Sequence, residues 1–355
     1  MFKRLLPLLL LILSGWTAAE PLRTGLVLSG GGARGLAHIG VLKQLEELNI
    51  PIHAIAGTSM GAVIGGLYAS GYSAEELEKL ALELDWQDAL SDSPQREDIP
   101  YRRKQDDRDF LVKQRLTFNN GVLSLPLGLL QGQNMGVVLE SLLVHTNEID
   151  NFDRLPIPFR AVATDIATGE AVVFDHGHLP LAIRASLALP GFFAPVEVDG
   201  RLLVDGVLSK NVPIDVARAM GVDRVIVVDI GTPLKSASEL TSVLDIMDQT
   251  TTLLTRTNTE KQLATLTDRD LLLQPALGNM GFSSFADAQQ AIDAGARSLA
   301  EANGVLAFVA PDGADSGGNL ASSRPQRQAI IHAIEVDNSG KVADEVVLGM
   351  IRQPI

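Results

Sequence analysis

The sequence contains no cysteine in its 355 residues, which excludes a disulfide framework, a thiol nucleophile and a thiolate metal site. Positive charge is also in short supply, because 29 lysines and arginines face 43 aspartates and glutamates and leave a formal net charge of −14. That balance argues against nucleic acid as a partner and against non-specific adhesion to anionic membranes.

The sequence also lacks any apolar run of the roughly twenty residues that a membrane helix needs. The apolar run Leu5–Leu13 is too short to span a bilayer; it follows Lys3 and Arg4 and precedes the small residues Thr17–Ala19. This pattern is typical of a secretory signal peptide, so we expect residues 1–19 to be removed on export. A retained N-terminal anchor is the alternative, and the lack of a following stop-transfer pattern disfavours it.

The hydrophobic content of 46% and the charged content of 20% fit one sizeable globular domain with a smaller unit attached. Strands are expected at 25–28 and 53–56, and each is followed by a helical stretch, at 36–48 and 60–69. Such alternation of strand and helix predicts an α/β fold. Its central sheet would be parallel or mostly parallel and covered by helices.

The second expected strand runs into the pentapeptide GTSMG at 57–61, which opens the next helix. A serine between two glycines at a strand-to-helix turn is the pattern of a nucleophile elbow. Gly57 and Gly61 would let two backbones approach closely while Ser59 sits at a strained, exposed apex. The free N–H groups of the adjoining helix would attract an anion. G-x-S-x-G is common by chance, so the pentapeptide alone leaves the role of Ser59 open.

The first expected strand ends in a glycine-rich loop, SGGGARG at 29–35. A dinucleotide site or P-loop fits poorly, because Gly30, Gly31 and Gly32 are consecutive and no Gly-Lys-Ser/Thr ending follows. An ordinary tight turn is the plain alternative. We favour an oxyanion hole, in which successive N–H groups of small residues stabilise the negative oxygen of a tetrahedral intermediate. The loop precedes the serine, as it does in α/β hydrolases.

Patterning predicts the rest of the sheet and its helices. Helices are expected at 74–84 with Ser73 as N-cap, and at 136–144, 181–189, 212–220, 239–267 and 285–302; strands are expected at 158–163, 171–174, 225–230 and 271–273. A hairpin at 196–204 turns at Asp199-Gly200 and leads into Asp205-Gly206. The charged stretch 91–109 is expected to be an exposed excursion. The apolar run 123–130 is either a buried connection or an apolar rim beside the active site.

An elbow serine needs a proton acceptor, and histidine is the usual one. Among the six histidines, His176 and His178 form the only pair downstream within the domain, near Asp175 in an expected loop. No histidine occupies an obvious late βα loop with an acid before it, as the Ser…Asp…His order requires. Asp205 can serve instead if burial raises its pKa and it touches the serine. The alternative is that Asp205-Gly206 forms a simple turn with no catalytic role, and the sequence alone supports that interpretation nearly as well. A pH–rate profile with an acidic limb near pH ~6.5 would indicate a histidine base.

Five blocks of the sequence resemble, in order, the successive motifs of the patatin-like phospholipases. They are GGGARGLAHIG at 30–40, GTSMG at 57–61, ATDIATGE at 163–170, AIRASLALPGFFAPV at 182–196 and VDGVLSKNVP at 204–213. The resemblance implies a three-layer α/β/α esterase with a Ser–Asp dyad and no catalytic histidine. It makes Ser59 the nucleophile and Asp205 the base of a dyad that works through an acyl-enzyme.

The same resemblance implies the supporting residues. It assigns Gly30, Gly31, Gly32 and Arg34 to the oxyanion-hole loop, with Arg34 bracing the loop, and Gly57, Gly61 and Gly206 to the elbow and dyad motifs. Val207 follows Gly206 where the family often has glycine or alanine, which is a departure beside the dyad. The implied activity is that of a phospholipase A or lysophospholipase acting on fatty acyl esters of membrane lipid. This scheme needs no metal and no cofactor, and no ligand-spaced acidic loop suggests calcium.

Two other functions stay open from the residues themselves. A Ser–His–Asp esterase would use His176 or His178 as its base. A non-catalytic module would bind a lipid headgroup or another phosphate with the glycine loop. Labelling of the serine by a fluorophosphonate would separate the enzymes from the binding module.

The last part of the chain differs in composition. Residues 20–310 form the predicted acyl hydrolase domain, residues 311–327 have the mixture of a linker, and residues 328–355 contain one expected strand and one expected helix. The stretch QAIIHAIEVDNSGKVADEVVLGMI resembles the start of a POTRA domain. With the signal peptide, this resembles the passenger of a PlpD-type (type Vd) autotransporter. The resemblance implies a Gram-negative cell-surface, outer-membrane or secreted protein, truncated before an outer-membrane barrel in cis, and leaves a homodimer open.

Overall fold

The computed structural model describes residues 22–91, 117–119, 122–124, 130–231, 234 and 236–309. The predictions for the signal peptide, for most of 91–109 and of the apolar run 123–130, for the linker and for the POTRA-like segment therefore lie outside the described residues. Among the helices that are described, none combines the length and the apolar character needed to cross a membrane.

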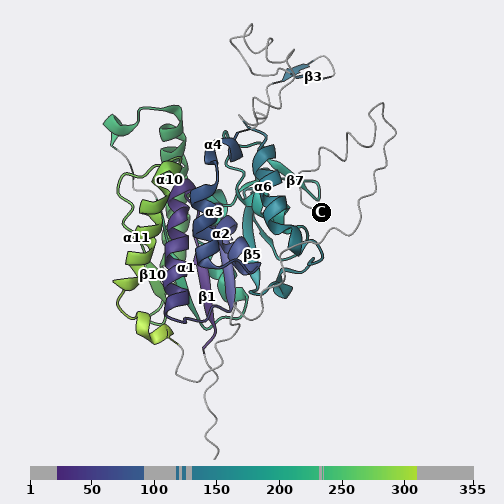
Figure 1. Cartoon of the computed structure of the whole chain (residues 1–355). Coiled ribbons are helices and arrows are strands. Elements are labelled where there is room, and N and C mark those ends of the chain that lie inside the picture. The colour runs from purple at the N-terminus through teal and green to yellow at the C-terminus, as the bar shows by residue number, and fades with distance from the viewer. Residues whose placement is uncertain are drawn as a thin grey trace, which may run out of the picture.

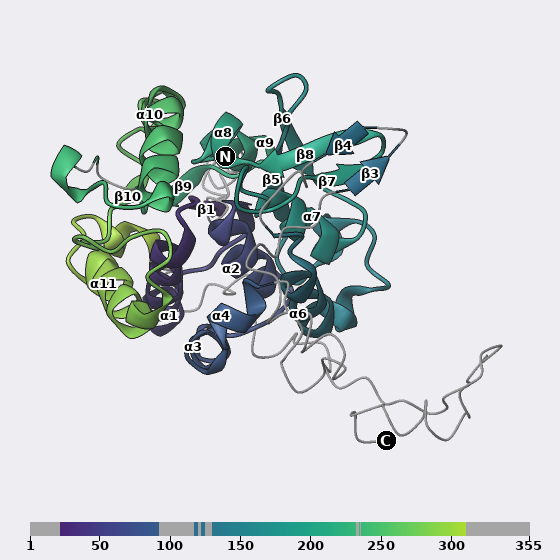
Figure 2. The same cartoon turned by 90° about the horizontal axis from the view of Figure 1, so that it is seen from above.

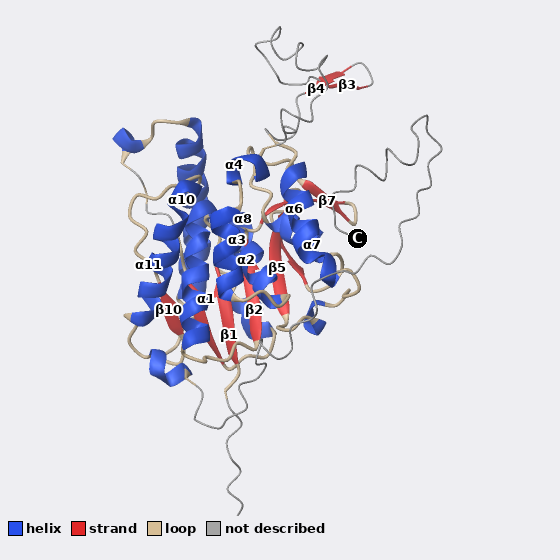
Figure 3. Cartoon of the chain, in the orientation of Figure 1, coloured by secondary structure: helices blue, strands red, loops and turns tan. Residues whose placement is uncertain are grey.

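The main sheet runs through the middle of the molecule (Figure 3). Its order is β10-β9-β1-β2-β5-β8-β7, with β6 paired to β5 off this path. The strands are β1 Thr24–Leu28, β2 Ala54–Thr58, β5 Phe159–Asp165, β6 Ala171–Phe174, β7 Val196–Val198, β8 Arg201–Asp205, β9 Arg224–Val228 and β10 Leu271–Leu273. A separate antiparallel pair consists of β3 Thr117–Asn119 and β4 Val122–Ser124.

The sheet is mixed rather than uniformly parallel. Strands β10, β9, β1, β2 and β5 run parallel, as the alternation of strand and helix predicts. Strands β6 and β8 pair antiparallel with β5, and β7 pairs antiparallel with β8; short turns join β5 to β6 and β7 to β8. The prediction of an α/β fold with a mostly parallel central sheet is therefore confirmed, and the antiparallel strands lie on its β5 side.

Helices cover both faces of this sheet and give three layers (Figure 2). One face carries α1 Ala37–Glu47, α2 Met60–Ala69, α3 Ala74–Glu83, α4 Trp86–Ala89, α6 Gln133–Leu143, α7 Leu179–Ser186 and α11 Ala288–Ala300. The other face carries α8 Val207–Lys210 and α9 Ile214–Ala219, and α10 Val243–Leu263 packs against α8. Short 3₁₀ turns lie at Gly32–Leu36, Val144–Thr146, Phe152–Arg154, Ala237–Glu239, Phe285–Asp287 and Val305–Phe308.

Local signals decided several element boundaries. Helix α2 has the predicted bounds, and α3 begins after the predicted N-cap Ser73. Ser73 and Glu76 form a capping box there, in which each side chain accepts the backbone N–H of the other residue. Helix α10 begins later than predicted, because Ser242 Oγ accepts the N–H of Asp245 and makes a new N-cap there. Figure 1 shows that α10 extends beyond the body of the molecule at its N-terminal end.

Two glycines bring α1 and α11 into backbone contact. A Cβ on Gly40 would lie 1.8 Å from the carbonyl oxygen of Ile292, and a Cβ on Gly295 would lie 1.8 Å from that of Ala37. Backbone atoms cannot move away as a flexible side chain can. Glycine at both positions therefore sets the distance between these helices, which cover the β1 and β9 side of the sheet.

Replacing Gly295 by alanine is expected to lower the free energy of unfolding by about 1–3 kcal/mol, because the new methyl group overlaps backbone of α1. Gly136→Ala is the matched control, since Gly136 lies inside α6 with nothing within 4 Å of its Cβ position. That variant should gain about 0.5–1 kcal/mol from helix propensity. Urea denaturation measures both, and equal effects of the two substitutions would contradict the close contact.

Candidate active site

Strands β2 and β8 meet end to end along one edge of β5. Thr58, the last residue of β2, pairs with Val162, and Asp205, the last residue of β8, pairs with the next residue, Ala163. Strand β6 occupies the opposite edge of β5 at Val162 and Ala163, so β2 and β8 must share the remaining edge. The residues that end these two strands are consequently neighbours in space although 146 positions separate Ser59 and Asp205.

Ser59 occupies a strained turn between β2 and α2. Its φ of 54° and ψ of −123° lie in a region that few residues other than glycine adopt. A Cβ on Gly57 would lie 2.4 Å from the Gly61 carbonyl oxygen, and one on Gly61 would lie 2.3 Å from that of Leu28. The two glycines therefore allow the strand, the turn and the helix to pack backbone against backbone, as the elbow pattern predicts.

The Ser59 hydroxyl donates a hydrogen bond of 2.6 Å to Oδ2 of Asp205. The second carboxylate oxygen, Oδ1, accepts the N–H of Val207 at 2.9 Å, so the carboxylate has a fixed orientation. Both side chains are about 1% exposed. Two further hydrogen bonds hold the backbone of Asp205. Its N–H donates to the Ala188 carbonyl, and its carbonyl accepts from the Thr164 hydroxyl.

Burial raises the pKa of Asp205 to about 7, against the opposing effect of the hydrogen bonds from Ser59 and Val207. An ordinary aspartate is a weak base, because its carboxylate holds a proton only in acid. A carboxylate with a pKa near neutrality accepts a proton much more readily. The environment therefore supplies one of the two properties required of a base, and the contact with Ser59 supplies the other.

The glycine loop lies beside this pair, with Gly30 and Gly31 on the wall of the cavity. The N–H of Gly30 donates to Oδ1 of Asn211 at 2.9 Å. Gly31 and Met60, by contrast, have no acceptor for their N–H groups among the described residues. Met60 is the first residue of α2, so its N–H also carries the positive end of the helix dipole.

Arg34 braces the loop from beneath and does not line the cavity. Its buried guanidinium donates to the carbonyl oxygens of Ile230, Gly231 and Met280 at 2.9–3.0 Å. Gly32 also lies away from the cavity: its φ is +58° and a Cβ there would come within 2.4 Å of the Phe282 carbonyl. Of the four predicted loop residues, Gly30 and Gly31 therefore reach the cavity, while Gly32 and Arg34 support the loop.

Two residues at this site were not singled out from the sequence. Ser186 at the end of α7 accepts the Ser59 N–H at 2.9 Å and donates to the Val162 carbonyl at 2.6 Å, which ties the elbow to β5. Asn211 follows α8 and accepts the Gly30 N–H. Both lie inside blocks that carry the patatin-like resemblance, AIRASLALPG and VDGVLSKNVP, so position in a motif was the available signal.

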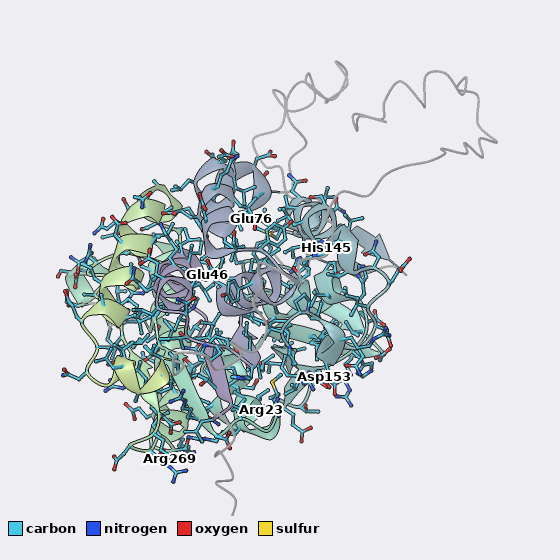
Figure 4. All side chains as sticks on the ribbon, turned by 60° about the horizontal axis from the view of Figure 1, so that its bottom comes forward. Arg23, Glu46, Glu76, His145, Asp153 and Arg269 are labelled. Carbon is cyan, nitrogen blue, oxygen red and sulfur yellow. The ribbon has the colours of Figure 1, made fainter. Side chains whose placement is uncertain are left out.

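None of the five described histidines lines the cavity, and no hydrogen bond joins any of them to Ser59 or Asp205 in the described part of the chain. The buried His38 donates from Nε2 to the Ser29 carbonyl, and burial lowers its pKa to about 4. His176 is exposed and pairs with Asp175, and His178 lies 3.3 Å from Glu140. His145 contacts the Ser70 carbonyl and is labelled in Figure 4.

His53 marks the opposite end of the sheet. Its Nδ1 accepts the N–H of Thr24, where β1 begins. That end is turned forward in Figure 4, with Arg23 and Arg269 shortly before β1 and β10. A candidate base at that end is separated from the elbow by the length of a strand.

A cavity of about 420 Å³ opens over the pair. Its walls are formed by Gly30, Gly31, Ser59, Leu189, Asp205, Val207, Asn211, Asp229, Gly231, Leu234, Thr251, Thr252, Thr255, Arg256, Thr259, Glu260, Leu263 and Phe282. The α10 side is rich in threonine, and its Arg256 pairs with Glu260 at 2.8 Å. No group of three or more acidic or histidine side chains suited to a metal occurs in the described ranges.

The model of the patatin-like phospholipase family matches residues 26–218, more than half of the chain. The chain belongs to the patatin-like phospholipase family. The matched residues run from β1 to α9 and include Ser59, Asp205 and Asn211.

Relatives share this part of the patatin-like chain. An uncharacterized NTE family protein of Mycobacterium tuberculosis is 36% identical over 208 residues, which are 59% of this chain and 49% of that protein. The human patatin-like phospholipase domain-containing protein 6 is 34% identical over 208 residues, covering 58% of this chain and 13% of that protein. The chain thus spans at most about half the length of these relatives.

Solved structures are more distant. VipD from Legionella pneumophila gives a TM-score of 0.43 at 16% identity, over 81% of this chain and 67% of that one. The type III effector protein ExoU gives a TM-score of 0.39 at 17% identity, over 81% of this chain and 53% of that one. Both scores lie below 0.5, so these likenesses add nothing to the family assignment.

The buried carboxyl of Asp205 should make stability depend on pH. Because its pKa rises from 3.8 unfolded to about 7 folded, the folded state holds the proton more tightly, and stability should fall as pH rises between about 4 and 7. At about 1.36 kcal/mol per pH unit the loss approaches roughly 4 kcal/mol. Asp205→Asn should therefore be more stable than the unsubstituted protein at about pH 8, and the difference should vanish near pH 4.

Chemical denaturation across this pH range measures the effect. Asp293→Asn, on the exposed side of α11, is the control for loss of one acid and should change stability by no more than about 0.5 kcal/mol. A constant difference between Asp205→Asn and the unsubstituted protein over the whole range would contradict the raised pKa.

Proposed function

We propose that this patatin-like phospholipase hydrolyses fatty acyl esters of phospholipids or lysophospholipids with Ser59 as nucleophile and Asp205 as base. The observation that carries the proposal is the 2.6 Å hydrogen bond from the Ser59 hydroxyl to a buried carboxylate at the floor of a cavity. The strained serine, the neutral-range pKa of Asp205 and the free N–H groups beside them support the same chemistry.

In the first step, the Ser59 oxygen attacks the carbonyl carbon of the ester while its proton passes to Asp205 Oδ2. The negative oxygen that forms is stabilised by the N–H groups of Gly31 and Met60, with the dipole of α2 behind the latter. A single donor of this kind is commonly worth about 3 kcal/mol of barrier. Asp205 then returns the proton to the leaving alcohol as the ester C–O bond breaks, which leaves Ser59 acylated.

In the second step, water attacks the acyl-enzyme. Asp205 takes a proton from the water as its oxygen bonds to the acyl carbon, and the same N–H groups hold the second oxyanion. The intermediate collapses to a free fatty acid, and the proton on Asp205 returns to Ser59. The whole cycle uses side chains and backbone of this chain, so it requires no metal and no cofactor.

The walls of the cavity suit an amphipathic ester. Leu189, Val207, Leu263 and Phe282 offer apolar contacts for an acyl chain, while the threonines of α10 offer hydroxyl groups to polar parts of the substrate. Membrane lipid as substrate also agrees with the export predicted from residues 1–19. The autotransporter passenger, the POTRA-like segment, the barrel in cis, a surface or secreted location and a homodimer all stay predictions.

Ser59→Ala and Asp205→Asn are each expected to reduce kcat/KM for release of fatty acid by at least about a thousandfold, because each removes one half of the proton-transfer pair. His176→Ala and His178→Ala are the controls and should retain activity. Fatty acid release from defined phosphatidylcholine and lysophosphatidylcholine micelles measures the rates and the position cleaved.

Labelling with a fluorophosphonate reports on Ser59 independently of substrate choice. A chain that is neither labelled nor active on esters would favour a non-catalytic lipid-headgroup or phosphate-binding module. A Ser59→Ala variant with full esterase activity would exclude Ser59 as the nucleophile. Loss of activity in His176→Ala or His178→Ala would instead favour the Ser–His–Asp esterase.

The pH–rate profile should have an acidic limb near pH 7, because Asp205 must be ionised to accept the Ser59 proton. kcat/KM is therefore expected to rise with pH up to about 7 and then to level. A histidine base would place the limb at about 6.5, so the profile does not separate the two bases as the sequence led us to expect. The substitutions separate them, and a limb near pH 4 would contradict the raised pKa of Asp205.

A further inference from the structure

We infer that Asn211 is a positioning residue that sets the oxyanion hole by holding the N–H of Gly30. This inference rests on the proposed function of Ser59 and Asp205. It concerns a residue that does not take part in proton transfer, and it assigns separate roles to the two glycines that line the cavity.

Asn211 lies at the end of a short structural link between the three parts of the site. Helix α8, Val207–Lys210, follows Asp205 with only its N-cap Gly206 between them. The Lys210 carbonyl accepts the hydroxyl of Thr58, the residue before the nucleophile, at 2.8 Å. Asn211 then accepts the Gly30 N–H at 2.9 Å. The seven-residue segment from Asp205 to Asn211 thus contains the base and contacts both the elbow and the glycine loop.

The loop is packed tightly where Asn211 holds it. A Cβ on Gly30 would lie 2.6 Å from Val207 Cγ1, 2.8 Å from Ser59 Cβ and 3.1 Å from Asn211 Oδ1. Behind Gly30, the Ser29 carbonyl accepts from His38, and the Ser29 hydroxyl accepts the Ile230 N–H at 2.9 Å. The peptide plane between Ser29 and Gly30 is therefore held on both sides, by His38 at the Ser29 carbonyl and by Asn211 at the Gly30 N–H.

This arrangement selects the oxyanion donors. With its N–H bonded to Asn211, Gly30 cannot donate to a substrate without giving up that bond. Gly31 then supplies the loop donor, because its N–H has no acceptor among the described residues and it lines the cavity. Ser186 occupies the Ser59 N–H in the same way and leaves the N–H of Met60 as the second donor. Two side chains thereby occupy the N–H groups of Gly30 and Ser59 and leave those of Gly31 and Met60 for the negative oxygen in the proposed reaction.

Loss of Asn211 should harm the transition state more than substrate binding. An unbonded Gly30 N–H can turn toward the cavity, and the Gly31 N–H then loses its fixed direction. A donor that is displaced by a fraction of an ångström still tolerates a neutral carbonyl but stabilises an oxyanion poorly. The expected signature is a fall in kcat with KM little changed.

The test uses the full chain with Asn211→Leu, which removes the acceptor and nearly conserves volume, and with Asn211→Ala. Asn258→Ala is the matched control, because Asn258 contacts the same segment through the Ser209 carbonyl at 3.5 Å but neither lines the cavity nor touches the glycine loop. The readouts are kcat and KM with a p-nitrophenyl acyl ester and the rate of labelling by a fluorophosphonate. Each is expressed per folded, reactive site, so partial unfolding lowers the yield without altering the rates.

For Asn211→Leu and Asn211→Ala, kcat and the labelling rate should fall about tenfold or more, with KM within about twofold of the unsubstituted value. Asn211→Asp keeps an acceptor oxygen and should recover a large part of the labelling rate. Asn258→Ala should remain within about twofold of the unsubstituted protein.

Several results would overturn the inference. They are unchanged kcat in Asn211→Leu, a loss confined to KM, or equal losses in the leucine and aspartate variants. If the unsubstituted chain itself is not labelled at Ser59, the proposed function fails and this inference fails with it. If Ser59 of the unsubstituted chain is labelled and the Asn211→Leu variant has unchanged rates, only the role of Asn211 is rejected and the proposed function stands.

Discussion

The site depends on the meeting of two strands, β2 and β8, along one edge of β5. Backbone pairing of Thr58 with Val162 and of Asp205 with Ala163 brings the serine and the carboxylate together before any side chain contributes. Gly206 permits this approach, since a Cβ there would lie 2.2 Å from the Val162 carbonyl. Strand pairing in the core therefore sets the relative positions of Ser59 and Asp205.

The buried position of Ser59 and Asp205 also gives them the properties that the proposed reaction uses, and it lowers the stability of the fold. Burial removes water from Asp205 and raises its pKa to about 7, while the elbow holds Ser59 at a positive φ. The backbone N–H groups near these two residues have different partners. Asn211 accepts the N–H of Gly30 and Ser186 accepts the N–H of Ser59, whereas the N–H groups of Gly31 and Met60 have no acceptor among the described residues. Helix α8 connects Asp205 to the glycine loop through Asn211.

Local sequence signals predicted the local structure well. Helix α2, the capping box of α3 and the hairpin at 196–204 all follow from short-range patterns of apolar, capping and turn residues. The predicted start of α10 at residue 239 was wrong, because Ser242 caps the helix and the periodicity of apolar residues does not show where a helix is capped. The roles of the glycine loop were predicted only coarsely, since Gly30 to Gly32 look alike in sequence and differ in what packs against each.

By itself the sequence determined the α/β fold class, the serine elbow, the glycine loop and, through five ordered blocks, the patatin-like family. It left the choice between Asp205 and a histidine to resemblance, because a base is defined by contact and burial rather than by residue type. Tertiary structure decided that contact, by joining strands far apart in the chain on one edge of β5 and leaving the described histidines elsewhere. It also brought Asn211 to the glycine loop, since only the folded chain carries the end of α8 to residues 181 positions away.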